Sequence, residues 1–450
     1  MHPIETVHLK SGPTPDATLS IGNPAVTVFV GPNNSGKSLV LRELQSYLIS
    51  GTTNRNFHIL ADLDFSTLDQ IHSEQILASL LEEAGLAVGI PEDTSFQMTR
   101  GNTTYGMTPK SVADVLAAPQ QNKKQYCDYY LTTNTLRLDG SNRLTLINKR
   151  PAGDLQKPNS SFARIVTDDA LRQSVRSVLY EAFDNYFVVD PTELGQLKIR
   201  YSSIEPQNTS IERSIADDAI KFFASATPIE QFSDGVKAFT GIVVEMFAGA
   251  PNVLILDEPE AFLHPTLSFL LGREISRSTP EALQKNVFIS THSASFVMGC
   301  IQSGADVNVV RLTYRNEQAT ARLIDSATLR NLMRNPLLRS TGVINALFYD
   351  YAIVVEADTD RAFYDEINSR LLLAKDDRAI PNCLFLNARN KQTVWEIVRP
   401  RRDLGIPVAT IVDVDIYKEG GTVWTHFLEG GNVPEISRVG LAQELSLIHI

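Results

Sequence analysis

The stretch VTVFVGPNNSGKSLVLRELQSYLI, residues 26–49, decides the fold class of this 450-residue chain. Its first five residues are apolar or β-branched, which predicts a buried strand. Leucines then recur at helical spacing, at Leu39, Leu41, Leu44 and Leu48. The connecting segment GPNNSGKS matches the pattern G-x-x-x-x-G-K-[ST], in which backbone N–H groups and the N-terminus of the next helix face phosphate. The stretch therefore predicts an α/β domain that binds a nucleotide.

The polar positions of this loop have expected tasks. Lys37 is expected to neutralise the β- and γ-phosphates, and the Ser38 hydroxyl to ligate Mg²⁺. The predicted ATP contacts are Gly31, Asn33, Asn34, Ser35, Gly36, Lys37 and Ser38. A glycine-rich surface turn is the plain alternative, but the position between an apolar strand and an amphipathic helix favours a phosphate loop.

Two further strand ends carry residues suited to ATP hydrolysis. The segment VLILDEPEAFLHP, residues 253–265, ends an apolar strand in Asp257 and Glu258. After a phosphate loop, such a pair predicts one carboxylate directed toward Mg²⁺ and a second that polarises the attacking water. His292 ends another apolar strand in VFISTHSASF, residues 287–296, and is expected to reach the γ-phosphate. The predicted catalytic residues are Lys37, Glu258 and His292, and the predicted Mg²⁺ ligands are Ser38 and Asp257.

Together these motifs resemble the ATP-binding-cassette class of ATPases, including its DNA-repair members, over most of residues 1–325. In that class a signature segment from a second subunit closes over the γ-phosphate. QFSDGVKAF, residues 231–239, looks like this signature, with Ser233 and Gly235 in the contact positions. Phe232 and Asp234 depart from the usual L-S-G-G-x pattern, and a plain helix cap would suit the same residues. The resemblance implies a homodimer with two shared ATP sites.

The chain around these motifs alternates strand-like and helix-like segments, which predicts a largely parallel sheet with helices on its faces. The ATPase domain is expected to span residues 1–345. Residues 52–205 lack a strong motif and are expected to form an inserted α+β or helical region on it. Within that region LRLDGSNRLTLI, residues 136–147, predicts a β-hairpin with Asp139 and Gly140 in the turn.

The composition favours a globular protein of a reducing cytoplasm. No apolar run reaches the roughly 18 to 20 residues that a membrane helix needs, and the N-terminus lacks the apolar core of a signal peptide. The three cysteines, Cys127, Cys300 and Cys383, are too far apart to form a metal-type pair. A net charge of −11 argues against a surface that is basic throughout, but it leaves room for a local nucleic-acid patch.

A second set of acids follows two later apolar runs. Glu356 and Asp360 lie in YAIVVEADTDRAFYDEI, residues 351–367, and Asp413 and Asp415 lie in VATIVDVDI, residues 408–416. Alternate residues of a strand point the same way, and such oxygen ligands suit Mg²⁺ or Mn²⁺. This E-x-x-x-D and D-x-D arrangement resembles the TOPRIM domain, which implies that the four acids bind metal and that Asp358 supports them. A non-catalytic cluster of strand-end acids is the alternative.

An ATP-binding-cassette domain followed by a TOPRIM domain resembles the OLD family (overcoming lysogenization defect) of ATP-dependent nucleases. The resemblance implies metal-dependent DNA cleavage, commonly in defence against phage, with DNA and a defence-system protein as partners. On the helix after Glu356, the expected buried face is Phe363, Ile367 and Leu371. The TOPRIM domain, residues 346–450, is expected to be incomplete, because only 35 residues follow Asp415 and the last six, LSLIHI, resemble translated adapter DNA.

Three functions fit these patterns. The first is an ATPase coupled to a TOPRIM endonuclease, which the strand-end acids favour. The second is an ATP-driven DNA-binding, sensing or repair ATPase whose TOPRIM domain does not catalyse. The third is a subunit that powers a membrane pump, which the acidic C-terminal domain and the degenerate signature disfavour.

Overall fold

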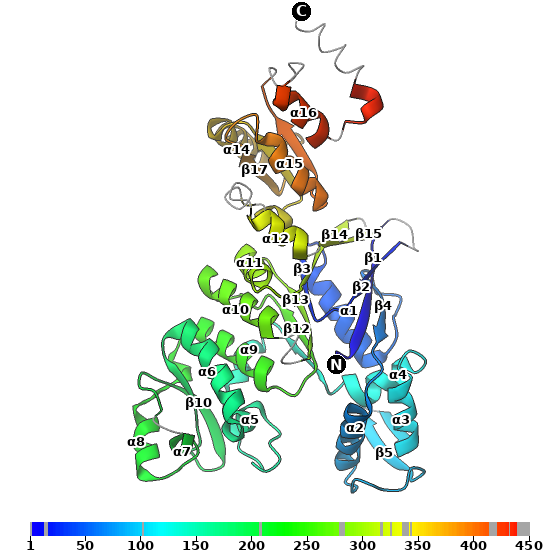
Figure 1. The fold of residues 1–450 in the computed structure, drawn as a ribbon, viewed down its shortest axis with the longest axis vertical. Helices are drawn as coiled ribbons and strands as arrows, with labels where there is room; N and C mark the ends of the chain where they lie inside the picture. The colour runs from blue at the N-terminus through cyan, green and yellow to red at the C-terminus, as the bar shows by residue number, and fades with distance from the viewer. Residues whose placement is uncertain are drawn as a thin grey trace, which may run out of the picture. The chain divides into compact units, whose positions relative to one another are not determined.

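The structure is a computed structural model that describes residues 2–12, 17–100, 103–206, 209–278, 284–315, 318–324, 326–334, 342, 344–413, 421–431 and 433–438. The chain divides into two compact units, one made of residues 1–29 and 37–308 and the other of residues 30–36 and 309–450 (Figure 1). The domain boundary drawn from the sequence, at residues 345 and 346, stays a prediction.

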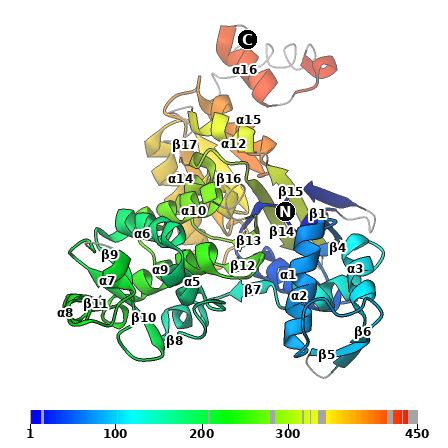
Figure 2. The same cartoon turned by 60° about the horizontal axis from the view of Figure 1, so that its bottom comes forward.

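A parallel sheet forms the centre of the first unit. Its strands include, in spatial order, β3 (Val26–Val30), β13 (Asn286–Ser290), β12 (Val253–Asp257) and β7 (Thr135–Leu138). Every residue of β3 and β13 is buried, as in parallel strands covered on both faces. Helix α1 (Lys37–Ser50) packs against β12 and β13, which lie side by side in Figure 2. The predicted strand at 26–30 and the predicted helix after the loop are confirmed.

Among the strands from residues 52–205, one joins the N-terminal antiparallel sheet and one joins the central parallel sheet. β4 (Leu60–Phe65) pairs with β1 (Ile4–Lys10), which also pairs with β2 (Thr18–Gly22) in an antiparallel sheet, and β7 pairs with β12. The predicted hairpin at 136–147 is wrong. The Asp139 carboxylate accepts the Ser141 N–H at 2.8 Å, and this turn leads into the 3-10 helix η2 (Arg143–Ile147) instead of a second strand.

The remaining elements of residues 66–228 form two groups that Figure 1 shows apart from each other. The first contains α2 (Gln70–Glu83), β5 (Phe96–Arg100), β6 (Thr103–Met107), α3 (Pro109–Ala117), α4 (Lys123–Tyr126) and the π-helix η1 (Cys127–Leu131). The second contains β8 (Arg150–Pro151), α5 (Ser161–Thr167), α6 (Asp169–Phe183), β9 (Tyr186–Asp190), β10 (Gln196–Ser202), α7 (Thr209–Glu212), α8 (Asp217–Ser225) and β11 (Thr227–Pro228). In the second group, Arg172 and Arg176 of α6 form buried ion pairs with Glu212 of α7.

Helices α10 (Pro265–Ser278) and α11 (Ala294–Gln302) approach each other closely at two glycines. A Cβ at Gly272 would lie 2.3 Å from the Phe296 carbonyl oxygen, and one at Gly299 would lie 2.0 Å from the Phe269 carbonyl oxygen. These helices begin just after the loops that follow β12 and β13. Their contact therefore holds the two loops together at the C-terminal edge of the sheet.

The second unit contains a hairpin, β14 (Asn308–Arg315) with β15 (Gln318–Ile324), and a parallel sheet in the order β17 (Cys383–Asn387), β16 (Tyr351–Val355) and β18 (Val408–Ile411). Its helices include α12 (Ser326–Arg334), α14 (Asp358–Ala374), α15 (Val394–Asp403) and α16 (Gly421–Gly430). Across the described ranges of both units, no helix combines the length and the apolar character needed to cross a membrane.

The buried face predicted for the helix after Glu356 is wrong at Phe363 and Ile367, whereas Leu371 is half-buried. In α14, Phe363 is 60% exposed and Ile367 is 39% exposed. Tyr364 packs against the core of β16 and β17 instead. Asn368 is also buried, and its amide exchanges hydrogen bonds of 2.8 and 3.0 Å with the backbone of Ile380. A polar residue takes an inward position here because the neighbouring loop needs backbone partners.

Candidate nucleotide site

The residues at the start of α1 and at the end of β12 meet at the C-terminal edge of the parallel sheet. Ser38, the second residue of α1, donates its hydroxyl to Asp257 Oδ1 at 2.9 Å. The Ser290 hydroxyl, at the end of β13, donates to the same oxygen. One carboxylate is therefore held between two hydroxyls, a set of hard oxygen donors that suits Mg²⁺.

Lys37 is a buried cation in this group, with only 4% of its surface exposed. Burial lowers the pKa of its ammonium to about 8, whereas the charges of Glu258, Glu260 and Asp257 act to raise it. A buried charge is tolerated only beside compensating groups. The structure thus assembles a cation among three carboxylates.

The loop before α1 has the backbone that its glycines allow. Gly31 and Gly36 have φ of 149° and 91°, and Asn34 has φ of 62°. A Cβ at Gly31 would lie 2.3 Å from the Leu312 carbonyl oxygen, so this position requires glycine. Asn33 and Asn34 are exposed, whereas Ser35 is 3% exposed and its hydroxyl has no hydrogen-bond partner among the described residues.

Glu258 and His292 face each other across the ends of β12 and β13. His292 Nε2 lies 3.0 Å from Glu258 Oε1, and both side chains are partly exposed. Glu258 has a left-handed backbone, with φ of 51°, and its N–H donates to the Ser290 carbonyl at 3.0 Å. Burial and then the charge of Lys37 lower the pKa of His292, so the imidazole is neutral at pH 7. A neutral ring can donate one N–H to the carboxylate.

Arg143 is a site residue that the sequence patterns missed. Its guanidinium donates to the backbone carbonyls of Glu258 at 2.5 Å and Asp257 at 2.8 Å, and its Nε donates to the Asp139 carbonyl at 3.0 Å. The residue is 2% exposed, and burial lowers its pKa. No sequence signal pointed to it, because it lies in the segment expected to be a hairpin and donates its hydrogen bonds to backbone carbonyls.

Glu260 and Thr291 were also missed. Glu260 Oε1 accepts the Thr291 hydroxyl at 2.7 Å and the His292 backbone N–H at 2.8 Å. Both residues stand inside the quoted motifs, DEPE and STHS, so proximity to Glu258 and His292 was the available signal. These bonds tie the loops after β12 and β13 to each other.

The signature-like segment lies at the start of α9 (Asp234–Ala248). Ser233 is exposed and makes no side-chain cap hydrogen bond, and the Asp234 carboxylate accepts a bond from Lys237 at 3.2 Å. Ser233 therefore does not act as a plain helix cap. Gly235 packs against the loop after Glu258, because a Cβ there would lie 2.7 Å from the Phe262 carbonyl oxygen.

The four predicted TOPRIM ligands are only partly placed. Glu356 follows β16 and Asp413 follows β18, which pairs directly with β16. Glu356 Oε2 is buried without a hydrogen-bond partner among the described residues, Asp360 accepts the Ala357 N–H at 3.2 Å, and Asp413 is exposed. Asp415 lies outside the described residues. Within the described ranges no group of three or more His, Cys, Asp or Glu side chains could hold a metal ion.

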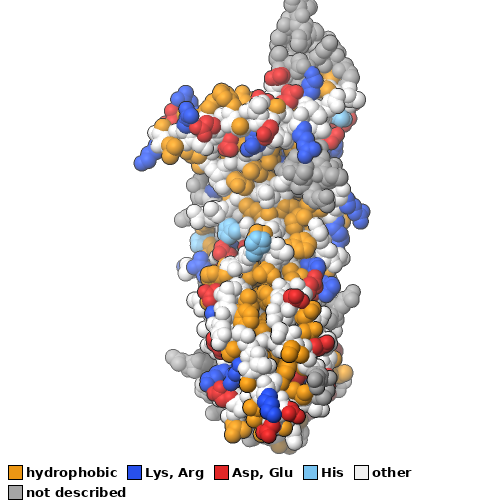
Figure 3. Space-filling view, turned by 90° about the vertical axis from the view of Figure 1, so that its left-hand side faces the viewer, with side chains coloured by type: hydrophobic (Ala, Val, Ile, Leu, Met, Phe, Trp, Pro, Cys, Tyr) orange, Lys and Arg blue, Asp and Glu red, His pale blue; other side chains and the backbone are white. Residues whose placement is uncertain are grey.

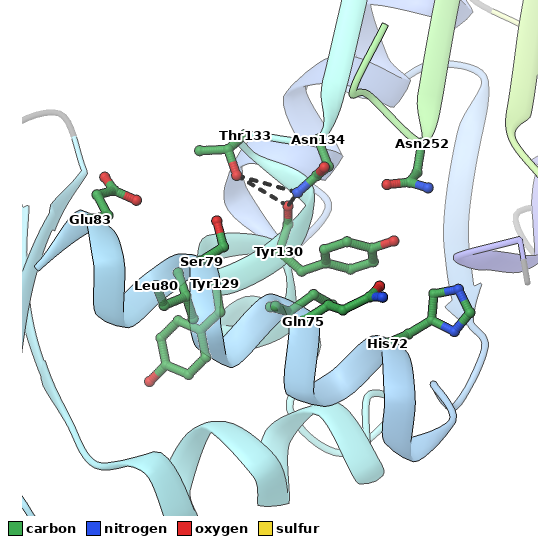
Figure 4. A pocket seen from close by; sticks show the side chains of 11 residues that line it. His72, Gln75, Ser79, Leu80, Glu83, Tyr129, Tyr130, Thr133, Asn134 and Asn252 are labelled. Atoms are coloured by element: carbon green, nitrogen blue, oxygen red, sulfur yellow. Dashed lines mark hydrogen bonds between the residues drawn. The ribbon is translucent and has the colours of Figure 1, made fainter. Parts of the chain in front are cut away.

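A cavity of about 400 Å³ lies elsewhere in the first unit (Figure 4). Asn134 and Asn252 line it where β7 and β12 begin, whereas the candidate site follows the opposite ends of these strands. In Figure 4 the side chains of His72, Gln75 and Tyr130 lie near Asn252 at one end of the cavity. Its described lining residues include no Lys or Arg. The cavity is therefore distinct from the phosphate site and lacks a cation to bind a phosphate.

The parallel sheet, the phosphate loop and the strand-end acids define the class of this chain as an α/β P-loop ATPase fold. A family model described as "AAA domain, putative AbiEii toxin, Type IV TA system" matches residues 108–298. This match includes Asp257, Glu258 and His292 and begins after the phosphate loop.

Similarity to individual proteins is low. No curated protein sequence matches the chain. The Smc head bound to the C-winged helix domain of ScpA is a similar solved structure, with 14% identity, a TM-score of 0.40, and coverage of 72% of this chain and 98% of that chain. The SMC head domain from Thermotoga maritima has 15% identity and a TM-score of 0.34, and covers 72% of this chain and 99% of that chain.

Proposed function

We propose that the chain is a Mg²⁺-dependent ATP hydrolase. One observation carries the proposal: Ser38 and Asp257 share a hydrogen bond of 2.9 Å beside buried Lys37, next to the Glu258–His292 pair. The donor set fits the ion, because a hydroxyl and a carboxylate oxygen already meet where Mg²⁺ would be held by Ser38 and Asp257. Bound there, Mg²⁺ would offset the charge of the phosphates.

The remaining residues divide the work of hydrolysis. Lys37 binds the phosphates, and Glu258 orients the attacking water and takes its proton. The water oxygen forms a bond to the γ-phosphorus while the bond from that phosphorus to the β–γ bridging oxygen breaks, which releases ADP and phosphate. His292, neutral beside Glu258, donates a hydrogen bond toward the carboxylate or the γ-phosphate.

Release of phosphate from ATP by the purified chain in Mg²⁺ tests this function. Lys37→Ala should abolish both nucleotide binding and turnover. Glu258→Gln should keep binding and lose at least about a hundredfold in kcat, because it removes the proton acceptor and preserves the shape. Turnover by Glu258→Gln at the wild-type rate, or no turnover by the wild type at any concentration of Mg²⁺, would refute the assignment.

We further propose that two copies share the ATP sites, with Ser233 and Gly235 of each copy over the γ-phosphate of the other. The support is local: Ser233 is exposed, makes no cap bond and precedes a helix of 15 residues, so the N-terminal N–H groups of α9 stay available to an anion. The resemblance to cassette ATPases adds the expectation of a homodimer.

The second candidate function is a nuclease of OLD type that ATP controls. The observation in its favour is Glu356 Oε2, a buried oxygen without a hydrogen-bond partner in the described parts of the chain, at the end of the central strand of the second unit's parallel sheet. The described acids do not complete a metal site, so no cleavage step is derived from them. Lys and Arg side chains are interspersed with Asp and Glu on the face drawn in Figure 3, so DNA binding would depend on a local patch.

Nicking of supercoiled plasmid in Mg²⁺ or Mn²⁺ tests the nuclease. Wild type, Glu356→Ala, Asp413→Ala and Lys37→Ala are compared. Loss of nicking in both acidic variants supports the TOPRIM assignment. ATP turnover without nicking supports the rival function, an ATPase that binds or senses DNA. The matched family description adds a third possibility, a toxin of a toxin–antitoxin pair, which would imply a protein partner.

A further inference from the structure

Glu260 is a half-buried acid that the proposed hydrolysis leaves without a task. Its Oε1 accepts two hydrogen bonds, from the Thr291 hydroxyl and from the His292 backbone N–H. Its Oε2 is buried and has no hydrogen-bond partner among the described residues. Burial raises the pKa of this carboxyl, although the two bonds act to lower it. A buried carboxyl oxygen is costly, so the contacts of this acid are expected to serve structure or catalysis.

The bonds of Glu260 continue into the helices behind the site. Thr291 Oγ1 accepts the Ser293 N–H at 2.9 Å, and the Ser293 hydroxyl caps α11 by accepting the Phe296 N–H at 3.1 Å. The hydroxyls of Ser293 and Ser268 of α10 are 2.9 Å apart. A continuous chain of hydrogen bonds thus joins Glu260 to the starts of both helices.

His292 is held at two points by a single loop. Glu260 binds its backbone N–H, and Glu258, two residues earlier, meets its imidazole Nε2 at 3.0 Å. Between these two contacts the chain turns at Glu258, which has a left-handed backbone with φ of 51°. The distance between imidazole and carboxylate therefore depends on how the His292 backbone is fixed.

We propose that Glu260 is a positioning residue, which holds the His292 backbone so that the imidazole meets the carboxylate that activates water. This inference rests on the proposed ATP hydrolysis. It assigns the geometry of the Glu258–His292 pair to an acid that bonds the Thr291 hydroxyl and the His292 backbone N–H. It also explains why the Oε1 atom takes both bonds, since each bond fixes one residue of the loop.

Two substitutions separate positioning from charge. In Glu260→Gln the amide oxygen still accepts both bonds, whereas Glu260→Ala leaves the Thr291 hydroxyl and the His292 N–H without an acceptor. We expect kcat to fall at least about tenfold in Glu260→Ala and less than about threefold in Glu260→Gln. The Kd of a fluorescent ATP analogue in Mg²⁺ should stay within about twofold in both. Equal losses of kcat in the two variants, or a loss in Kd that matches the loss in kcat, would overturn the proposal.

A second readout does not need turnover. The ¹⁵N resonances of the His292 ring in the nucleotide-free protein, assigned with His292→Gln, report the tautomer and the pKa of the imidazole. Because the Glu258 carboxylate acts to raise the pKa of the His292 imidazole, we expect Glu260→Ala, which loosens this contact, to lower that pKa further and Glu260→Gln to change it less. Thr291→Val removes one of the two hydrogen bonds to Glu260 and should shift the His292 resonances in the same direction by less. It replaces Glu260→Ala in this experiment if Glu260→Ala does not fold. If the His292 ring resonances do not shift in these variants, the positioning role of Glu260 is wrong. If the resonances shift but the wild type does not hydrolyse ATP, only the hydrolase assignment is wrong.

Discussion

Lys285 is a buried cation that bonds to the backbone and lies away from the candidate nucleotide site. Its ammonium donates to the Gly249 carbonyl at 2.8 Å, and the residue is 5% exposed. Burial lowers its pKa to about 8, although Glu245 acts to raise it. Because the folded pKa is below the unfolded value of 10.5, the unfolded chain binds more protons between these values. The contribution of this group to stability therefore rises with pH from about 8 to 10.5.

We expect Lys285→Met to change the free energy of unfolding in a pH-dependent way. At pH 7 the variant is free of the charged ammonium that the wild type buries. As the pH rises from 8 to 10 the wild type gains stability, so the difference in free energy of unfolding, variant minus wild type, should fall by up to about 1.4 kcal/mol per pH unit. Urea denaturation across this range measures the difference. Lys157→Met, whose side chain is 78% exposed, should give a flat difference. A flat line for Lys285→Met would contradict the buried-charge explanation.

Arg143 supports the site through backbone atoms. In Arg143→Met the carbonyls of Asp257 and Glu258 lose their donors. We expect the free energy of unfolding to fall by about 2–4 kcal/mol and kcat to fall at least about tenfold, because Glu258 loses its fixed backbone. Arg370→Met, at a side chain 77% exposed, is the matched control and should leave both unchanged. Retention of kcat in a folded Arg143→Met protein would contradict this role.

Single residues show why some of the site could be predicted and the rest could not. Lys37, Ser38 and Asp257 were predictable, because phosphate and Mg²⁺ demand particular side chains at fixed spacing. The structure places these three together. Arg143 donates to backbone carbonyl groups, which every residue carries, so no pattern of side chains records it. Glu260 lies within a quoted motif, but its bonds to Thr291 and to the His292 N–H depend on the fold.

At the scale of elements, the close contact of α10 with α11 fixes the starts of the two helices that follow β12 and β13. Gly299→Ala would place a Cβ 2.0 Å from the Phe269 carbonyl, and backbone cannot yield as a flexible side chain does. We expect a loss of about 1–3 kcal/mol in the free energy of unfolding, measured by thermal or urea denaturation. Gly106→Ala is the control, because no atom lies within 4 Å of its added Cβ. Equal stability of the two variants would show that the helices can separate at no cost.

Helix α14 gives a second test at this scale. The exposed Phe363, which the sequence pattern assigned to the buried face, is the neighbour of the inward-facing Tyr364. We expect Tyr364→Ser to destabilise the chain by about 2–4 kcal/mol and Phe363→Ser to change stability by less than about 0.5 kcal/mol. Paired urea denaturation curves measure both. The reverse order would restore the face predicted from the sequence.

Elements were predictable where periodicity and burial coincide. Strands β3, β12 and β13 are continuous apolar runs because they are covered on both faces. The segment at 136–147 failed because Asp139 and Asn142 bond local backbone, which closes a turn without a second strand. In α14 the apolar residues outnumber the inward positions, so helical spacing alone could not choose the buried face.

At the scale of the whole molecule, the shared-site proposal predicts a dimer that depends on ATP. Glu258→Gln should bind ATP and Mg²⁺ without turnover. Its molar mass, measured by light scattering, should therefore double with ATP and remain that of the monomer with ADP. Ser233→Arg in the same background should remain monomeric, because a large side chain blocks the exposed start of α9. Asp218→Arg, at an exposed position of α8, is the control and should still dimerise. A dimer of the Ser233→Arg variant would count against the signature assignment.

The clamp by Arg143 has an evolutionary consequence. Arg143 bonds to the backbone carbonyl groups of residues 257 and 258, so these hydrogen bonds do not depend on the side chains at these positions. Glu258 also has a left-handed backbone, which asparagine and glycine adopt readily. On the role proposed for Glu258, a single substitution at position 258 would therefore remove the base for hydrolysis while the loop keeps its shape. One such substitution would leave a protein that binds ATP and responds to it without hydrolysing it.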